Sequence, residues 1–162
     1  MGTQNHIIVR SINTSERKGT AKTPVESAVI TKEGIQGDAH SGPWNRQISL
    51  LSVQSLIDFR EVAGRTIDYG EFAENLTLEG IDLTGVNLLD RFINNQTELE
   101  VTQIGKKCHG DNCAIFREVG KCAMPKEGIF CRVIRTGAVR TGDHFTYKPK
   151  TFRALVVTLS DR

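Results

Sequence analysis

The residues best suited to chemistry in this sequence are its four cysteines, which fall within one short segment. They are Cys108, Cys113, Cys122 and Cys131, and no cysteine precedes them. In a secreted protein an even number of cysteines suggests disulfide bonds. In a reducing cytosol a cluster more often indicates metal binding, a reactive thiol or burial. The cluster therefore marks this segment as a candidate site.

Cys108 is the strongest candidate among the four for a nucleophile or a metal ligand. It stands between Lys107 and His109, whose positive charge favours the thiolate over the thiol. It also follows a strand predicted over residues 99–104, and a thiolate at a strand end is suited to either role.

A structural zinc site is the alternative for the same segment. Its ligands would be Cys108, His109, Cys113 and Cys122. Against zinc, four residues rather than the more usual two separate Cys108 from Cys113, and no second pair at that spacing follows. Cys131 stands in an apolar segment and is predicted to be a core residue.

A second candidate site is the glycine-containing loop over residues 34–47. Gly37 allows the backbone to turn sharply and approach a ligand. Asp38 provides an acceptor, His40 a titratable donor and Arg46 a fixed cationic fork, a set that suits a phosphate or another oxyanion. A surface loop in which Asp38 caps a turn and Arg46 is solvated fits the same residues.

A third candidate is Asn75, in a polar turn over residues 70–80 that runs into a strand. Its amide offers both a donor and an acceptor, so it can bridge loops or hold a ligand. An asparagine that only fixes its own turn is the structural alternative.

The elements that position these residues are mostly short strands. Apolar segments at close spacing, separated by Gly, Asp and Asn, favour an antiparallel or mixed β-barrel over alternating βαβ units. The expected strands are 6–12, 25–31, 47–51, 75–78, 86–92, 99–104, 129–134, 144–147 and 155–159. A helix is predicted to begin after the cap Ser52 and to end at Gly64. A second short helix is expected over 112–119, and 137–143 is expected to be a turn between two strands.

Size and charge limit the function classes. The 162 residues, 38% hydrophobic and 25% charged, describe one globular domain. The net charge of +2 gives no reason to expect a nucleic-acid partner, so any anion site must be local. No apolar stretch approaches the roughly 20 residues that span a bilayer, and the first residues lack a secretory signal, so we expect a cytoplasmic protein with no membrane partner.

Five segments in this order resemble the MOSC family, the molybdenum cofactor sulfurase carboxy-terminal domain. They are 34–40, 46–50, 70–77, Cys108 and 137–143. The resemblance covers about residues 5–148 and implies a mainly β fold, a MOSC-type β-barrel with one or two short helices. It also implies binding of the molybdenum cofactor (molybdopterin). The cofactor-binding candidates are then Gly37, Asp38, His40, Arg46 and Asn75.

The same resemblance assigns a role to Cys108. It matches the cysteine that ligates molybdenum in amidoxime-reducing relatives, so we expect it to contact the metal or to carry a persulfide. Accessory residues would be Lys107, His109, Cys113 and Cys122. We expect no pyridoxal-phosphate site in this chain, so the sulfur donor would be a partner, such as a cysteine desulfurase or another cofactor-synthesis enzyme. A molybdenum-dependent reductase of N-hydroxylated compounds and a zinc-stabilised interaction domain remain the alternatives.

The last residues suggest a further unit. Residues 152–162 resemble the opening strand and Ser-Asp-Arg turn of a molybdopterin adenylyltransferase-like domain. We therefore expect 149–162 to be a linker and the first strand of a truncated second domain. A last strand that closes the barrel is the alternative.

Overall fold

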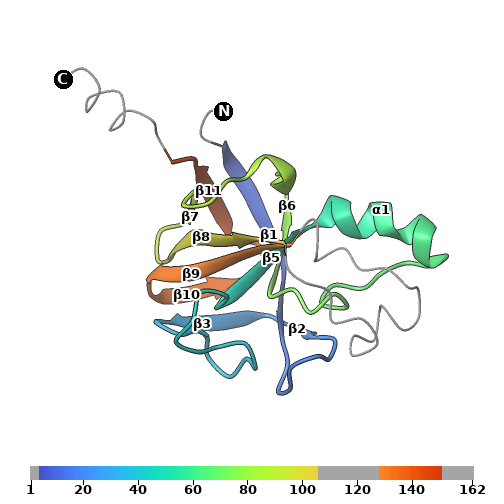
Figure 1. Ribbon diagram of the computed structural model, residues 1–162, viewed down its shortest axis with the longest axis horizontal. Coiled ribbons are helices and arrows are strands. Elements are labelled where there is room, and N and C mark those ends of the chain that lie inside the picture. Colours follow the sequence, from blue (N-terminus) through green and yellow to red (C-terminus); the bar gives the residue numbers. More distant parts are fainter. Residues whose placement is uncertain (1–3, 106–127, 151–162) are drawn as a thin grey trace.

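Strands with one buried and one more exposed face build the wall of a barrel. In the first strand Ile7 and Val9 are fully buried, whereas their neighbours His6 and Arg10 are exposed, as expected for a strand with one face on the core. The computed structural model describes residues 4–105 and 128–150, and Figure 1 shows these strands wrapped around one interior.

Seven strands close the barrel in the order β11-β7-β8-β9-β5-β6-β1, and β1 pairs back with β11. They are β1 (Gln4–Thr14), β5 (Ile48–Ser52), β6 (Leu76–Glu79), β7 (Arg91–Ile93), β8 (Glu98–Ile104), β9 (Ile129–Arg135) and β11 (His144–Lys148). Only β5 and β6 run parallel within this ring. The expected mixed β-barrel, mainly β in content, is therefore confirmed.

A smaller sheet and one additional strand lie outside the ring. β10 (Gly137–Arg140), β3 (Ser27–Thr31) and β4 (Gly34–Ile35) form the small sheet, and β2 (Thr23–Val25) pairs with β1. The single strand expected over 25–31 is thus two strands, because Val25 pairs with Ile12 whereas Ser27 pairs with Arg140. The expected turn over 137–143 was too long, since its first four residues form β10.

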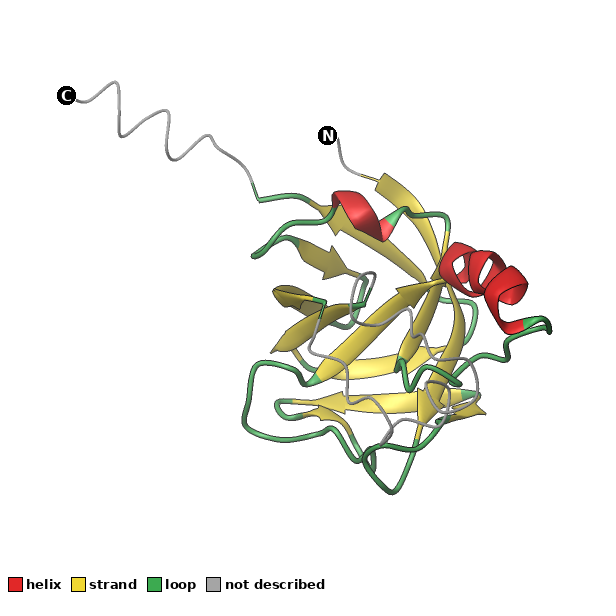
Figure 2. Ribbon diagram, turned by 45° about the vertical axis from the view of Figure 1, so that its right-hand side comes forward, coloured by secondary structure: helices red, strands yellow, loops and turns green. Residues whose placement is uncertain are grey.

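The helix α1 (Val53–Ala63) begins and ends where the sequence predicted. The Ser52 hydroxyl accepts a hydrogen bond from the backbone N–H of Ser55, and Gly64 closes the helix at φ +72°. The apolar side of α1 packs on the outside of β5, where Leu51 faces the helix while Leu50 faces the barrel interior. This double packing explains why β5 is buried along its whole length. Figure 2 shows α1 on the outer side of the barrel.

The segment before β7 is less regular than expected. A strand was predicted over 86–92, but a short 3₁₀ turn (Leu83–Gly85) comes first and the strand itself covers only Arg91–Ile93. Leu89 has φ +74°, and the Asp90 carboxylate accepts a hydrogen bond from the backbone N–H of Asn87. These two features stabilise a turn where a strand was predicted.

Two predicted elements, the helix over 112–119 and the strand over 155–159, lie outside the described residues. Within the part of the chain that is described, no helix is long and apolar enough to cross a membrane.

Candidate functional site

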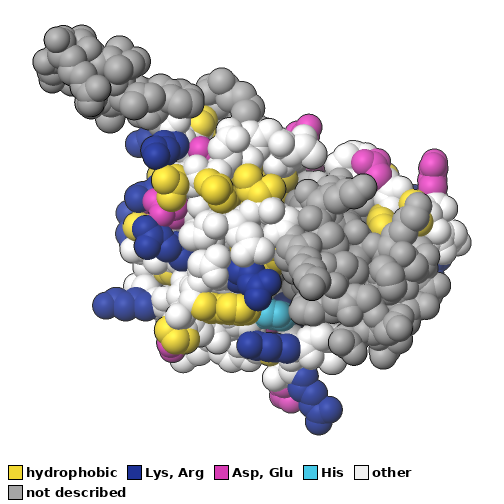
Figure 3. Space-filling view, in the orientation of Figure 1, with side chains coloured by type: hydrophobic (Ala, Val, Ile, Leu, Met, Phe, Trp, Pro, Cys, Tyr) yellow, Lys and Arg dark blue, Asp and Glu magenta, His cyan; other side chains and the backbone are white. Residues whose placement is uncertain are grey.

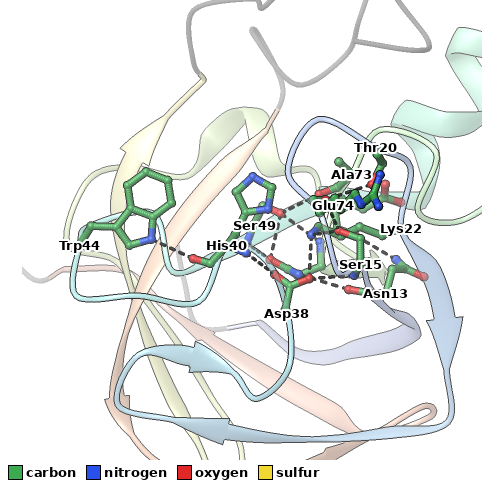
Figure 4. A network of polar contacts seen from close by, with 12 residues as sticks. Asn13, Ser15, Thr20, Lys22, Asp38, His40, Trp44, Ser49, Ala73 and Glu74 are labelled. Atoms are coloured by element: carbon green, nitrogen blue, oxygen red, sulfur yellow. Dashed lines mark hydrogen bonds and ion pairs between the residues drawn. The ribbon is translucent and has the colours of Figure 1, made fainter. Parts of the chain in front are cut away.

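A buried carboxylate organises the glycine-containing loop. Asp38 Oδ1 accepts from Lys22 Nζ at 2.7 Å and from the backbone N–H of Ser15 at 3.0 Å. Its Oδ2 accepts from the backbone N–H of His40 at 3.1 Å. The side chains of Lys22 and Asp38 are both fully buried. Figure 4 shows this network at the centre of the candidate site.

This ion pair joins two loops that are separate in the sequence. Lys22 and Ser15 belong to the loop between β1 and β2, whereas Asp38 follows β4. A further hydrogen bond runs from the backbone N–H of Ala39 to the Ser15 carbonyl at 2.8 Å. Burial by itself raises the pKa of Asp38, but the hydrogen bonds and charge of Lys22 outweigh it and hold that pKa below its ordinary value. Asp38 is therefore held as a carboxylate.

Asn75 joins two strands, β1 and β5, from a fully buried position. Its side-chain oxygen accepts from the backbone N–H of Ser49 at 3.0 Å, and its amide nitrogen donates to the Asn13 carbonyl at 3.2 Å. The bridging role considered for Asn75 is the one these contacts describe. It lies just before β6 and ties the ends of β1 and β5 together, beneath the loop that Asp38 organises.

A buried glutamate next to Asn75 supports the same region, and the sequence pattern did not single it out. Glu74 is fully buried, and its Oε2 accepts from Thr77 Oγ1 at 2.8 Å and from the backbone N–H of Gly70 at 3.0 Å. Burial raises its pKa above the ordinary value. Gly70 has φ +90°, and a Cβ there would lie 2.2 Å from the Lys22 carbonyl oxygen. Only glycine fits at this close approach between the two segments.

The outer surface of the loop presents cations and aromatic rings. Arg46 Cζ lies 4.6 Å from the Trp44 ring centroid and 5.9 Å from that of Phe130. Lys18 Nζ lies 4.9 Å from the Trp44 ring. The Trp44 N–H donates to the His40 carbonyl at 2.8 Å, and the two rings lie 5° from parallel. In Figure 3 one histidine is visible between basic side chains, with a hydrophobic side chain next to it.

The predicted anion-site residues thus divide into two groups. His40 and Arg46 lie partly exposed on the loop surface, and Gly37 is exposed at φ +84° with open space where a Cβ would be. Asp38 and Asn75 lie beneath them and bond to protein groups. The sequence did not indicate Lys18 as a site residue, because Lys18 lies in a different loop that only the tertiary structure brings next to Trp44. The signal for Trp44 was its place in the loop as the single tryptophan.

The loop contacts the end of β8. The Thr102 hydroxyl donates to the Asn45 carbonyl, and the Asn45 amide lies 3.4 Å from the Gln103 side-chain oxygen. β8 ends at Ile104, and the next residue, Gly105, donates its N–H to the Gly128 carbonyl at 2.7 Å. The loop therefore lies beside the end of β8, and the cysteine-containing segment follows β8 in the sequence and precedes β9.

Of the predictions for the four cysteines, the structure tests only the one for Cys131. The predictions for the other three cysteines and their neighbours concern residues outside the described ranges: Lys107, Cys108, His109, Cys113 and Cys122. Cys131 is fully buried in the barrel core, as predicted, and burial raises the pKa of its thiol. In the described ranges, no group of three His, Cys, Asp or Glu side chains could hold a metal ion.

Comparisons with known proteins identify one matching family and several solved structures with a similar fold. The family described as "MOSC domain" matches residues 37–146. The YUAD protein from Bacillus subtilis has 20% identity and a TM-score of 0.77, over 93% of this chain and 99% of its own. YiiM from Geobacillus stearothermophilus has 22% identity and a TM-score of 0.72, over 91% and 78%. YiiM from Escherichia coli has 19% identity and a TM-score of 0.63, over 91% and 70%. No curated protein matches the chain.

Proposed function

Because this chain belongs to the MOSC domain family, whose members are associated with the molybdenum cofactor, we propose that it binds this cofactor and serves in its maturation. In this proposal Arg46 holds the cofactor's phosphate and Cys108 provides the reactive thiol. When bound, the cofactor supplies a redox-active molybdenum centre. The chain's own residues supply the anion site and the thiol.

The main support for the proposal is the position of Arg46 on a loop whose backbone is held by buried contacts. The buried pair of Lys22 and Asp38 anchors the loop, and the Arg46 guanidinium rests on Trp44 and Phe130. A partly exposed guanidinium on a fixed backbone is suited to a charge-assisted fork with a phosphate. This donor set fits the phosphate end of a pterin cofactor.

The other predicted residues support Arg46 in different ways. His40 lies beside the Trp44 ring, where its imidazole can contribute a further hydrogen bond to an anion. The open space at Gly37 lets a ligand approach the backbone. Asp38 and Asn75 act as positioning residues, because their polar atoms hold the loop and the strands beneath it.

Cys108 would take part as a sulfur carrier or as a molybdenum ligand. It follows Gly105 by three residues in the sequence, and three residues of extended chain span at most about 11 Å. As a carrier, its thiolate would attack the terminal sulfur of a persulfide on a cysteine desulfurase. The new S–S bond would then lie on Cys108, and the donor cysteine would leave as a thiolate.

Cofactor binding can be tested on protein purified from a host with an intact cofactor pathway. We expect pterin fluorescence and molybdenum to copurify with the wild-type protein, and Arg46→Ala to lose most of both. Arg140→Ala is the matched control, because Arg140 is exposed on β10 and distant from the loop in sequence. Wild-type protein that contains neither pterin nor molybdenum, and takes up neither on reconstitution, would refute the proposal.

The sulfur-carrier role has its own test. After incubation with a cysteine desulfurase and cysteine, mass spectrometry should find a reducible adduct of about 32 Da on Cys108. Cys131 is the internal control, because it is buried and its thiol pKa is raised. Cofactor binding without this adduct would leave ligation as the role of Cys108.

A further inference from the structure

A groove lies on the outer wall of the barrel, where β11, β7 and β8 are neighbours (Figure 1). Its volume is about 370 Å³. Arg91 points outward into it, because the next residue of β7, Phe92, is buried in the core. We call it the outer groove, and three apolar and three basic side chains line most of it: Leu89, Ile93 and Pro149, and Arg91, Lys148 and Lys150.

One buried carboxylate, that of Asp90, holds two sides of the outer groove together. It accepts a hydrogen bond from the backbone N–H of Asn87 at 2.8 Å, in the turn that carries Leu89. It also accepts from the backbone N–H of Lys150 at 2.7 Å and from the Tyr147 hydroxyl. The groove therefore has its shape before a ligand arrives, which reduces the entropic cost of binding.

The strand register places charged residues in one row across the outer groove. Lys148 on β11 lies opposite Arg91 on β7. Arg91 in turn lies opposite Glu100 on β8, which lies opposite Arg132 on β9. The Glu100 carboxylate accepts from both arginines, each at 2.8 Å, and Arg91 also pairs with Glu98. Both carboxylates are therefore already paired with arginines.

The two lysines of the outer groove have no such partner. Among the described residues, neither Lys148 nor Lys150 forms an ion pair with a carboxylate. Lys148 instead lies opposite the like charge of Arg91, an arrangement that destabilises a strand pair. Leu89 beside them is 43% exposed at φ +74°, which leucine rarely adopts. A ligand with carboxylates and an apolar group would offset both costs.

We propose that the outer groove binds a short acidic segment of a partner protein. One apolar side chain of that segment packs on Leu89 and Ile93, and its carboxylates pair with Lys148 and Lys150. Charge complementarity decides the class of partner, because a nucleic acid needs a continuous row of cations for its phosphates, and Glu100 interrupts this row. The volume is at the small end of ligand sites, which run from about 300 to 1,000 Å³, so only a few side chains enter. The inference goes beyond the proposed function and does not depend on cofactor binding.

Binding can be measured by fluorescence anisotropy with a fluorescein-labelled peptide of sequence Glu-Asp-Leu-Leu-Asp-Glu. We expect saturable binding to the wild-type protein. The variant with both Lys148→Ala and Lys150→Ala should bind about tenfold more weakly, because two charge pairs are lost. Leu89→Asn should weaken binding about fivefold, because it removes an apolar contact while asparagine tolerates the positive φ. A peptide with serine in place of both leucines should bind more weakly by a similar factor.

The variant with both Arg17→Ala and Arg140→Ala is the matched control, because it removes two positive charges from exposed positions outside the groove. It should bind the peptide as the wild-type protein does, and thermal melting checks that all variants are folded. The inference is overturned if the peptide does not bind the wild-type protein, if both double variants weaken binding equally, or if the serine peptide binds as tightly. Binding that depends on Lys148 and Lys150 only with single-stranded DNA, or only with vesicles of phosphatidylcholine and phosphatidylserine, would also overturn it.

Discussion

Breaking the ion pair between Lys22 and Asp38 should destabilise the protein far more than breaking a surface pair of similar length. Their nitrogen and oxygen lie 2.7 Å apart and both side chains are fully buried. Removing one partner leaves the other charge buried without its counter-charge, which costs about 3 to 5 kcal/mol. For a chain of this size, the melting temperature should fall by roughly 6 to 20 °C.

A double-mutant cycle measures this coupling. We expect Lys22→Met and Asp38→Asn each to lower the free energy of unfolding in urea by about 3 to 5 kcal/mol. The double variant should cost less than the sum of the two, because no buried charge is then left without its partner. The control is Arg10 and Glu79, which lie 2.8 Å apart with side chains 45% and 44% exposed. Breaking that pair should cost at most about 1 kcal/mol.

The pH dependence gives the same prediction a second test. The folded-state pKa of Asp38 is held below its ordinary value, so the stability it contributes is present above the unfolded-state pKa. That contribution is lost as the pH falls through the folded-state pKa. The reasoning is refuted if the single variants cost no more than the Arg10 and Glu79 controls, or if their effects are additive.

Three further predictions concern the residues around this pair. Burial raises the pKa of Glu74, so the free energy of unfolding of the wild-type protein should decrease as the pH rises through that folded-state pKa. Urea unfolding of Glu74→Gln at several pH values should show a weaker pH dependence in this range. An unchanged pH dependence would contradict the prediction. Gly70→Ala places a Cβ 2.2 Å from a backbone oxygen at φ +90°, so unfolding should become easier by more than about 1 kcal/mol, whereas Gly142→Ala, at φ +94° with open space around it, should cost less. In the native protein Cys131, fully buried with a raised pKa, should resist alkylation until denaturant is added, and labelling at the rate of an exposed thiol would show that the core opens.

Local patterns in the sequence were enough to predict much of the barrel. The β-branched run over 6–12 predicted the first strand, and Ser52 with Gly64 predicted both ends of the helix, because strand propensity and helix caps depend on neighbouring residues. The split between β2 and β3 at Glu26 was not predictable in this way. It arises because Val25 and Ser27 pair with strands that are far away in the sequence.

The same division applies to the candidate site. The sequence by itself was enough to predict a loop that carries His40 and Arg46, the burial of Cys131 and the resemblance to the family. These features depend on residue type and on the local order of residues. Only the tertiary structure decided that Lys18 meets the Trp44 ring and that Lys22 neutralises Asp38. Such pairings depend on how the barrel brings separate loops to one end, and the spacing of residues along the chain does not contain that information.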